Sequence, residues 1–340
     1  MDIGQLFLYL LLVAISTGVV WKGSFILEDS ADRLSAFYQL PPIVQGAIIA
    51  AVGSSFPELS STVLATLLHG KFELGIAAIV GSAIFNILVI PGIAGLVSGD
   101  LKVDRFLVYK DAQFYITSVT VLLLAFAFAV IYNPVEGVPL QGNLNRPLAL
   151  IPITLYGLYL FLQQQDTKEA KKESLPPEVE IRVIWEWLRL LFSLGLIVVS
   201  VEGLVTAAIG LGEILKTPSF LWGLTTIAIA TSLPDTFVSV KAAREGRSTI
   251  GLANVLGSNI FDLLVAIPVG VLIAGASTVN FAVAAPMMAV LTLATIILFA
   301  MLRTKFFLSP VECWILLGLY VVFIVWMVLE TVGITNVVNF

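Results

Sequence analysis

The chain has 340 residues, of which 59% are hydrophobic and only 12% are charged, whereas soluble domains carry about 25% charged residues. This composition excludes an ordinary water-soluble protein and indicates that lipid surrounds most of the chain. The net charge of −5 gives no indication of nucleic-acid binding. The single cysteine excludes an intramolecular disulfide, and the single histidine excludes a histidine-rich metal site.

Hydrophobic runs predict helices that cross a bilayer. Lipid-exposed backbone must satisfy its own hydrogen bonds, which leaves only helices or a closed barrel. The runs at residues 119–131 and 282–301 lack the alternation of barrel strands, so we predict an all-α polytopic membrane protein. The first run, residues 3–20, has no basic leader or cleavage site and is expected to remain as a span. Ten transmembrane helices are predicted, near residues 4–28, 41–68, 73–97, 109–131, 147–164, 183–213, 218–242, 250–275, 279–302 and 309–331.

A charged segment at residues 165–182 divides the chain into two halves, 1–164 and 183–340. With the N-terminus outside, only Lys71, Arg146 and Lys216 of the 18 lysines and arginines fall on the outer side, and the remaining fifteen fall on the inner side. Inner loops are enriched in basic residues. We therefore predict that both termini lie outside, that the 165–182 linker is cytoplasmic, and that the protein resides in the plasma membrane.

Each half contains a copy of one sequence motif. Residues 46–96 resemble residues 223–273, with Pro57 matching Pro234 and Gly81 matching Gly257. Each half has five predicted spans, an odd number, so the second half enters the membrane in the opposite orientation. The sequence therefore predicts two inverted five-helix repeats, which place a substrate site near the midplane where the copies meet.

A proline interrupts the second span of each half. A proline inside a helix frees the carbonyl four residues earlier, here those of Gly53 and Ala230. The sequences Ser-Phe-Pro-Glu around Pro57 and Ser-Leu-Pro-Asp around Pro234 predict capping boxes that restart each helix. An alternative is an ordinary proline kink patched by hydroxyl groups, but that reading does not explain why a carboxylate follows both prolines.

Three acids, Glu58, Asp235 and Asp262, lie in the middle of predicted spans, with no lysine or arginine nearby in these segments. An ionised carboxylate at mid-bilayer costs roughly 2.5–3.5 kcal/mol. One explanation is that all three are protonated packing groups. The other is that carboxylates, hydroxyls and freed carbonyls form an oxygen-only site, which suits hard cations such as Ca²⁺ and Na⁺. Zinc or copper would call for histidine and cysteine ligands.

Two further pairs of residues have simpler interpretations. Lys22 and Glu202 occupy corresponding places in the first and sixth spans, but inverted symmetry separates them in depth. Lys22 is therefore expected to extend toward the inner surface, with Glu202 facing a water path, rather than the two forming an ion pair. Gly81 and Gly257 are expected to allow close helix packing.

The motifs resemble the α-repeats of the cation/calcium exchanger superfamily, which includes the sodium/calcium exchangers. The first repeat reads GSSFPE at residues 53–58 and GSAIFN at 81–86, and the second reads ATSLPD at 230–235 and GSNIFD at 257–262. The resemblance implies a secondary antiporter, not an enzyme and without a cofactor, that exchanges Na⁺ for Ca²⁺ by alternating access. It also implies that the first and sixth spans slide past the bundle.

The resemblance further implies which residues bind the ions. Glu58 and Asp235 would bind Ca²⁺. The neighbouring sodium sites would use Ser54, Ser55, Ser82, Asn86, Thr231, Ser232, Ser258 and Asp262. The backbone carbonyls of Ala51 and Ala228 would be additional ligands.

Two departures from the family pattern leave the coupled ion open. Ala230 stands where most members have glycine, and Asp235 stands where prokaryotic sodium/calcium exchangers usually have glutamate. The combination of SLPD with SNIFD resembles the potassium-dependent exchangers, so K⁺ transport is an alternative, as is H⁺/Ca²⁺ exchange. In other classes, a cation channel with acidic rings and an intramembrane aspartyl hydrolase remain alternatives. The oligomeric state is not predicted.

Overall fold

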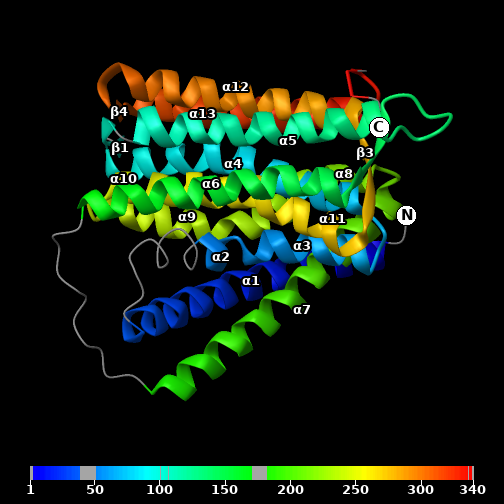
Figure 1. The fold of residues 1–340 in the computed structure, drawn as a ribbon. Coiled ribbons are helices and arrows are strands. Elements are labelled where there is room, and N and C mark those ends of the chain that lie inside the picture. The colour runs from blue at the N-terminus through cyan, green and yellow to red at the C-terminus, as the bar shows by residue number, and fades with distance from the viewer. Residues whose placement is uncertain are drawn as a thin grey trace.

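The computed structural model describes residues 3–38, 51–99, 101–105, 107–170, 182–335 and 337–338. Nearly all of them belong to helices that run in a common direction, and the two ends of the chain lie at the same end of the bundle (Figure 1). This arrangement confirms the predicted all-α class. The long helices are α1 (Ile3–Phe37), α4 (Phe72–Ser98), α5 (Ala112–Tyr132), α6 (Arg146–Ala170), α7 (Val183–Leu215), α12 (Phe281–Lys305) and α13 (Pro310–Thr331).

Shorter helical segments make up the rest of the bundle. The α-helical ones are α2 (Ala51–Ser54), α3 (Phe56–Leu67), α8 (Ser219–Trp222), α9 (Ala228–Arg244), α10 (Ser248–Phe261) and α11 (Ile267–Ala274). Three more, Leu107–Asp111, Gly223–Ile227 and Asp262–Ala266, are π-helical.

Eight helical stretches of the described chain are long and apolar enough to cross a membrane. They correspond to eight of the ten predicted spans. The other two, near 41–68 and 218–242, are the spans that carry the proline motifs. The first contains α2 and α3, with residues 41–50 outside the described part of the chain, and the second is divided into α8, a π-helical segment and α9. The count of ten spans therefore remains a prediction.

Helix α4 lies at the centre of the bundle, and 94% of its most apolar window is buried. A helix that is hydrophobic all round must be surrounded by other helices. It packs against α9 and α13 on different sides and also contacts α3 and α12. The large apolar core is built around this helix, which carries one of the predicted site motifs.

Two short β-ribbons join the halves at opposite ends of the bundle (Figure 1). Strand β1 (Leu101–Lys102) follows α4 and pairs antiparallel with β4 (Phe307–Leu308), which follows α12. Strand β3 (Ala276–Asn280) follows α11 and pairs antiparallel with β2 (Gln141–Asn145), which follows α5. Strands β1 and β3 occupy corresponding places in the two halves, and so do β2 and β4. The β1–β4 ribbon is therefore the counterpart of the β3–β2 ribbon, as expected for inverted repeats.

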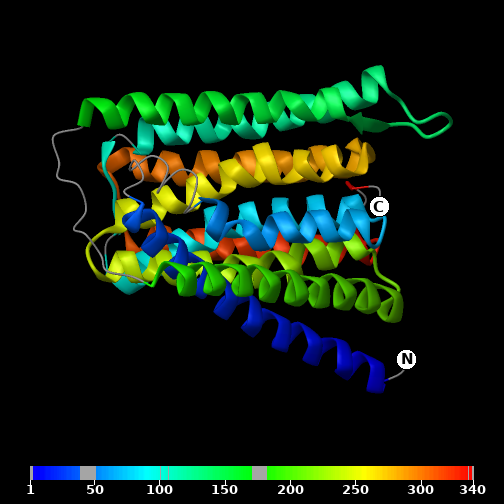
Figure 2. The same ribbon diagram turned by 60° about the horizontal axis from the view of Figure 1, so that its bottom comes forward.

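Helices α1 and α7 pack on each other along one flank of the bundle (Figures 1 and 2). Glycines allow close contact, because a Cβ on Gly203 would lie 2.4 Å from Ser16 Oγ, and one on Gly210 would lie 2.3 Å from the Tyr9 ring. Near the end of α1 and the start of α7, Arg189 donates to Asp29 at 3.0 Å and to Glu186 at 3.0 Å. These contacts join the two helices into one unit.

Within the described residues, Lys22 and Glu202 form no ion pair. The Glu202 carboxylate instead lies 2.8 Å from the His69 ring nitrogen, in the turn after α3, and accepts a bond from Thr206 at 3.2 Å. Lys22 is exposed, and no carboxylate of the described chain forms an ion pair with it. Glu202 thus connects the α1–α7 pair to the rest of the bundle through His69.

Candidate cation-binding site

Four helices bring the two repeat motifs together inside the bundle. Helices α3 and α4 come from the first half, and α9 and α10 come from the second half. Helix α4 packs along α9, while α3 packs on α4 and α10 packs on α9. Every predicted site side chain that the structure describes is buried, with an exposed fraction of 2% or less.

Gly81 allows the close approach of α4 to the second repeat. A Cβ at this position would lie 2.2 Å from Leu224 O and 2.8 Å from Ala228 Cβ, distances that no side chain can adopt. Its repeat partner behaves differently, because the atom nearest to a Cβ on Gly257 is Tyr159 Oη at 4.0 Å. The prediction of close packing is therefore confirmed for Gly81 and is wrong for Gly257.

Serine hydroxyls from the two repeats pair across the interface. Ser55 Oγ lies 2.7 Å from Ser258 Oγ, and Ser82 Oγ lies 2.7 Å from Ser232 Oγ. Ser55 corresponds to Ser232 in the repeat alignment, and Ser82 corresponds to Ser258. The two bonds are therefore equivalent under the repeat symmetry: in each, the serine of a proline motif in one half bonds to the serine of the Gly-Ser motif in the other half.

One hydroxyl of each pair also reaches the acid of its own repeat. Ser82 donates to Glu58 Oε1 at 3.3 Å, and Ser258 donates to Asp235 Oδ2 at 3.0 Å. Asn254 donates to the other Asp235 oxygen at 3.4 Å. The result is two separate chains of hydrogen bonds, Glu58–Ser82–Ser232 and Asp235–Ser258–Ser55, and each connects the acid of one repeat to a serine of the other.

The remaining predicted hydroxyls cross between the repeats as well. The Ser54 side chain interacts with Asp235 of the second repeat, and Thr231 interacts with Glu58 of the first. Ala228 is buried at the start of α9, and its carbonyl lies 3.3 Å from the Thr231 hydroxyl. The structure places Ala51 at the start of α2.

The predicted ligand Asn86 bonds to Asn259, and neither Asn259 nor its further partner Tyr115 was predicted as a site residue. Asn86 donates to Asn259 Oδ1 at 2.9 Å, and Asn259 donates to Ala83 O at 3.4 Å and to Tyr115 Oη at 3.2 Å. Asn259 stands inside the GSNIFD motif, but its counterpart in the first repeat is Ala83, so the repeat comparison gave no signal. Tyr115 comes from α5, outside both motifs.

The predicted capping boxes are wrong in both repeats. In the first, the chain does break, since α2 ends at Ser54 and α3 begins at Phe56, but the Ser55 side chain makes no capping bond. Its hydroxyl bonds with Ser258 instead. In the second, α9 continues through Pro234 without a break.

The second repeat is irregular at other places than its proline motif. The π-helical segment Gly223–Ile227 ends just before Ala228, whose amide reaches back five residues to Gly223 O. A second such segment begins at Asp262, where the Ile267 amide bonds to Asp262 O. Pro268 follows directly and has no amide hydrogen to continue the regular pattern. Such bulges are frequent at functional sites.

Several oxygen atoms of the site have no hydrogen-bond partner in the described structure. They are Glu58 Oε2, both carboxylate oxygens of Asp262, and Asn86 Oδ1, although the Ser55 side chain interacts electrostatically with the Asp262 carboxylate. No described lysine or arginine forms an ion pair with Glu58, Asp235 or Asp262. Buried charge without a partner is costly, so the site requires either a cation or protons.

The acids alone do not form a closed metal cage. Within the described residues, no three carboxylate, imidazole or thiol side chains converge closely enough to hold a metal ion. A cation here would need hydroxyl, amide or backbone oxygens together with carboxylates, as hard cations accept.

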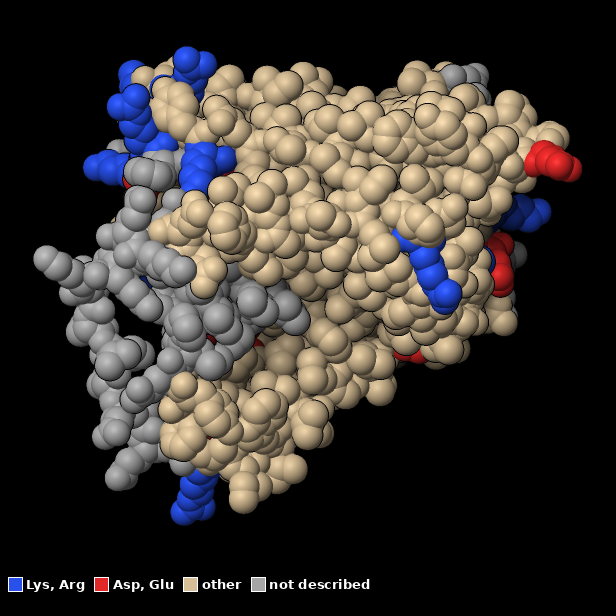
Figure 3. All heavy atoms as spheres, in the orientation of Figure 1, with Lys and Arg blue, Asp and Glu red and all other residues tan. Residues whose placement is uncertain are grey.

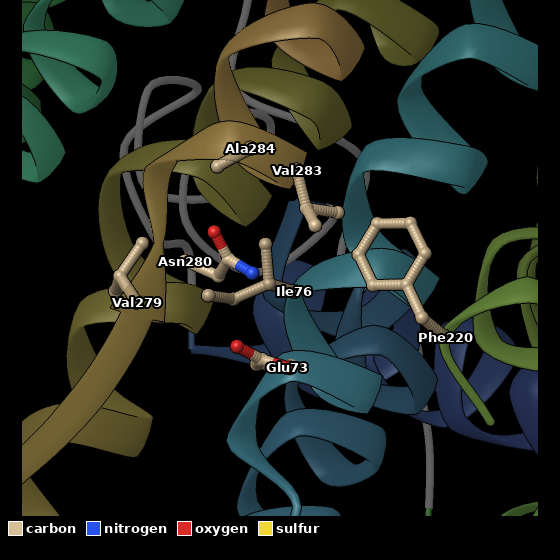
Figure 4. Close-up of a pocket in the computed structure, with 7 residues that line it drawn as sticks. All are labelled: Glu73, Ile76, Phe220, Val279, Asn280, Val283 and Ala284. Carbon is tan, nitrogen blue, oxygen red and sulfur yellow. The ribbon is translucent and has the colours of Figure 1, made fainter. Parts of the chain in front are cut away.

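A pocket lies apart from this network, at the end of the bundle where α4 begins. It is lined by Glu73, Ile76, Phe220, Val279, Asn280, Val283 and Ala284 (Figure 4). None of the predicted site residues lines it. Its walls are mostly apolar, and the Asn280 oxygen is already bonded to the Ala282 amide at 3.0 Å.

Comparison with known proteins places these features in context. The family described as "Sodium/calcium exchanger protein" matches residues 8–164 and 185–329. The chain is 27% identical to the inner membrane protein YrbG of Escherichia coli over 277 residues, which cover 76% of this chain and 80% of that protein.

Two solved structures share the fold. The sodium-calcium exchanger NCX_Mj aligns with a TM-score of 0.58 and 23% identity, covering 93% of this chain and 98% of that chain. The H⁺/Ca²⁺ exchanger CAX aligns with a TM-score of 0.69 and 17% identity, covering 92% of this chain and 81% of that chain. At these identities the likeness is one of fold.

Proposed function

Because the chain belongs to the sodium/calcium exchanger protein family, we propose that it exchanges Na⁺ for Ca²⁺ across the membrane by alternating access. The observation that carries the proposal is the buried site in which Glu58 and Asp235 are each connected to the other repeat through a pair of serine hydroxyls. Three acids without a basic partner supply negative charge where a hard cation would be dehydrated.

In this proposal Glu58 and Asp235 are the calcium ligands. The sodium ions bind to neighbouring oxygens, for which the unpartnered atoms of Asp262 and Asn86 are candidates. The other sodium ligands are Ser54, Ser55, Ser82, Thr231, Ser232 and Ser258, with the Ala51 and Ala228 carbonyls as additional ligands. The two cations compete for overlapping oxygens, and this exclusion couples their gradients.

Access to the site alternates when α1 and α7 move together along the flank of the bundle. Their glycine contacts and the Arg189–Asp29 ion pair support movement as one unit. Under the topology predicted from the basic residues, the protein lies in the plasma membrane with both termini outside and the 165–182 linker in the cytoplasm. Residues 171–181 of this linker lie outside the described part of the chain.

The test is calcium uptake by proteoliposomes under imposed sodium, potassium and proton gradients, one at a time. Sodium-loaded vesicles diluted into sodium-free buffer should accumulate Ca²⁺. Glu58→Gln should abolish uptake, because it removes a ligand charge with little change of shape. Uptake that ignores the sodium gradient and follows a pH gradient would contradict sodium coupling.

H⁺/Ca²⁺ exchange is the second candidate, and its support is the fold shared with the H⁺/Ca²⁺ exchanger CAX. Protons on the acids would then replace sodium as the balancing charge. Potassium co-transport is a variant of the first candidate, since three acids balance either three Na⁺ or one Ca²⁺ with one K⁺. The potassium and proton arms of the same flux experiment separate these cases.

A further inference from the structure

Basic side chains gather where the β1–β4 ribbon closes one end of the bundle. In Figure 3 lysines and arginines cluster at that end of the face shown. In the ribbon, Lys102 lies opposite Phe307. Lys305 Nζ lies over the Phe307 ring, 5.8 Å from its centroid. Lysines from both halves of the chain are thus positioned near Phe307, Lys305 over its ring and Lys102 opposite it in the ribbon.

Beside them, two arginines converge on a second ring. The Arg105 guanidinium lies 5.4 Å from the Tyr109 ring centroid, and the Arg303 guanidinium lies 5.8 Å from it. Tyr109 packs in turn on Phe306, with centroids 6.2 Å apart. Each cation is attracted to the ring face, but two like charges on one ring repel each other. An anion bound between the two guanidinium groups would relieve this repulsion.

The described chain does not supply that anion. Lys102, Arg105, Arg303 and Lys305 are exposed, and none of them forms an ion pair with a described carboxylate. Asp104, the nearest acid in sequence, uses one carboxylate oxygen to accept from the Leu107 amide at 3.0 Å.

An arginine on the next loop at the same end of the bundle behaves differently. Arg247 binds Glu245 directly, and this hydrogen bond lowers the pKa of the Glu245 carboxyl. The lack of a carboxylate partner at the four cations around Tyr109 and Phe307 therefore does not extend to every basic residue at this end.

We propose that these four cations bind the phosphate headgroup of an anionic phospholipid in the adjacent leaflet. Guanidinium groups match phosphate oxygens in pairs. The patch stands at the point where α5 begins and α12 ends, the depth at which headgroups lie beside a spanning helix. Basic pockets between helix ends are a known mode of headgroup recognition. Under the predicted topology this leaflet is the inner one.

The site is connected to the candidate cation-binding helices. The Val103 amide donates to Phe306 O at 2.9 Å, and the Asp104 amide donates to Thr249 Oγ1 at 3.2 Å. Thr249 stands in the first turn of α10, which carries Ser258 toward its other end. A lipid bound here would brace the ribbon and the start of α10 at once.

The experiment measures lipid retention on the intact protein, independently of transport. Wild type, Arg105→Gln/Arg303→Gln and the control Arg247→Gln are exchanged into nanodiscs of phosphatidylcholine with a minor share of phosphatidylglycerol. Bound phosphatidylglycerol is then counted by native mass spectrometry. At about 1 kcal/mol per basic residue near an anionic surface, we expect the double variant to lose at least about tenfold in affinity, with the control unchanged.

Two controls keep the result interpretable. If the double variant does not purify, Arg105→Gln and Arg303→Gln are tested singly, each with a smaller expected loss. Soluble glycerol phosphate is added as a competitor, and it should not displace the lipid. Equal retention by the double variant and wild type, equal loss in the Arg247→Gln control, or displacement by glycerol phosphate would overturn the proposal.

Discussion

Ser82 occupies a central place in the polar network. Its hydroxyl lies between Glu58 and Ser232, so it contacts the acid of its own repeat and the serine of the other. Removing one partner from a buried polar group leaves the other unsatisfied, at a cost of about 1–3 kcal/mol. The crossed serines therefore contribute both to the fit between the halves and to the orientation of the acids.

Ser82→Ala should weaken exchange by about tenfold at limiting sodium, because one such bond is worth about 1.4 kcal/mol or more. The matched control is Ser118→Ala. Ser118 is equally buried, but its hydroxyl bonds only to Phe114 O of its own helix at 2.9 Å. Sodium dependence of calcium flux checks both variants. An equal effect of the two substitutions would assign Ser82 a merely structural role.

Within the motifs at 53–58 and 81–86 and their counterparts at 230–235 and 257–262, Asp262 is the position at which the two repeats differ in charge, since its partner is Asn86. Both of its oxygens are buried without a hydrogen-bond partner. If its charge holds a monovalent ion, Asp262→Asn should reduce sodium or potassium dependence more than calcium binding. Calcium flux measured over a series of sodium and potassium concentrations checks this. An unchanged dependence of the flux on sodium and potassium would count against Asp262 as a charged ligand of a monovalent ion. Loss of calcium binding alone would indicate that Asp262 binds Ca²⁺ instead.

The sequence was sufficient to select the four crossed serines but not to pair them. Repeat alignment identified Ser55, Ser82, Ser232 and Ser258, because each motif occurs twice. Which hydroxyl meets which depends on how α4 crosses α9, and no local pattern encodes that geometry. Tyr115 was missed for the same reason, since it reaches Asn259 from a helix without a motif.

Helix α4 is the element whose packing holds the site together, and Gly81 is the point of closest contact. Gly81→Ala should destabilise the protein by about 1–3 kcal/mol, because the new methyl group would meet the Leu224 carbonyl, a backbone atom that cannot rotate away. The control is Gly257→Ala, whose added methyl group has nothing closer than 4.0 Å. Thermal unfolding in detergent compares them, and similar melting temperatures would contradict this packing.

Helix breaks were predicted less well than helices. Pro57 does separate α2 from α3, whereas Pro234 lies inside a continuous α9. A proline removes one hydrogen bond, but whether the helix breaks depends on its surroundings. In the second repeat the irregularity falls in the π-helical segments before Ala228 and after Phe261, which residue patterns do not reveal.

At the scale of the whole molecule, the two ribbons and the crossed serine pairs agree with inverted repeats. The chain ends lie at one end of the bundle, as an even number of spans requires (Figure 1). The side of the membrane that each end faces comes only from the distribution of lysine and arginine.

Cysteine labelling tests the orientation. Lys171→Cys, in the linker and outside the described residues, should react only after the membrane is made permeable. Glu136→Cys, on the exposed loop between α5 and β2, should react in intact cells. The native Cys313 is buried and should remain unlabelled. Labelling of position 171 in intact cells would show that the linker lies outside and would contradict the predicted orientation.

The central claim is that calcium movement is coupled to a counter-moving ion at the network around Glu58 and Asp235. The most direct measurement is calcium flux in sealed proteoliposomes whose sodium gradient is inverted during the recording. Coupled exchange predicts that net calcium flux reverses against its own unchanged gradient, and that Glu58→Gln removes both directions. Flux that continues down the calcium gradient whatever the sodium gradient does would indicate a channel and contradict the account.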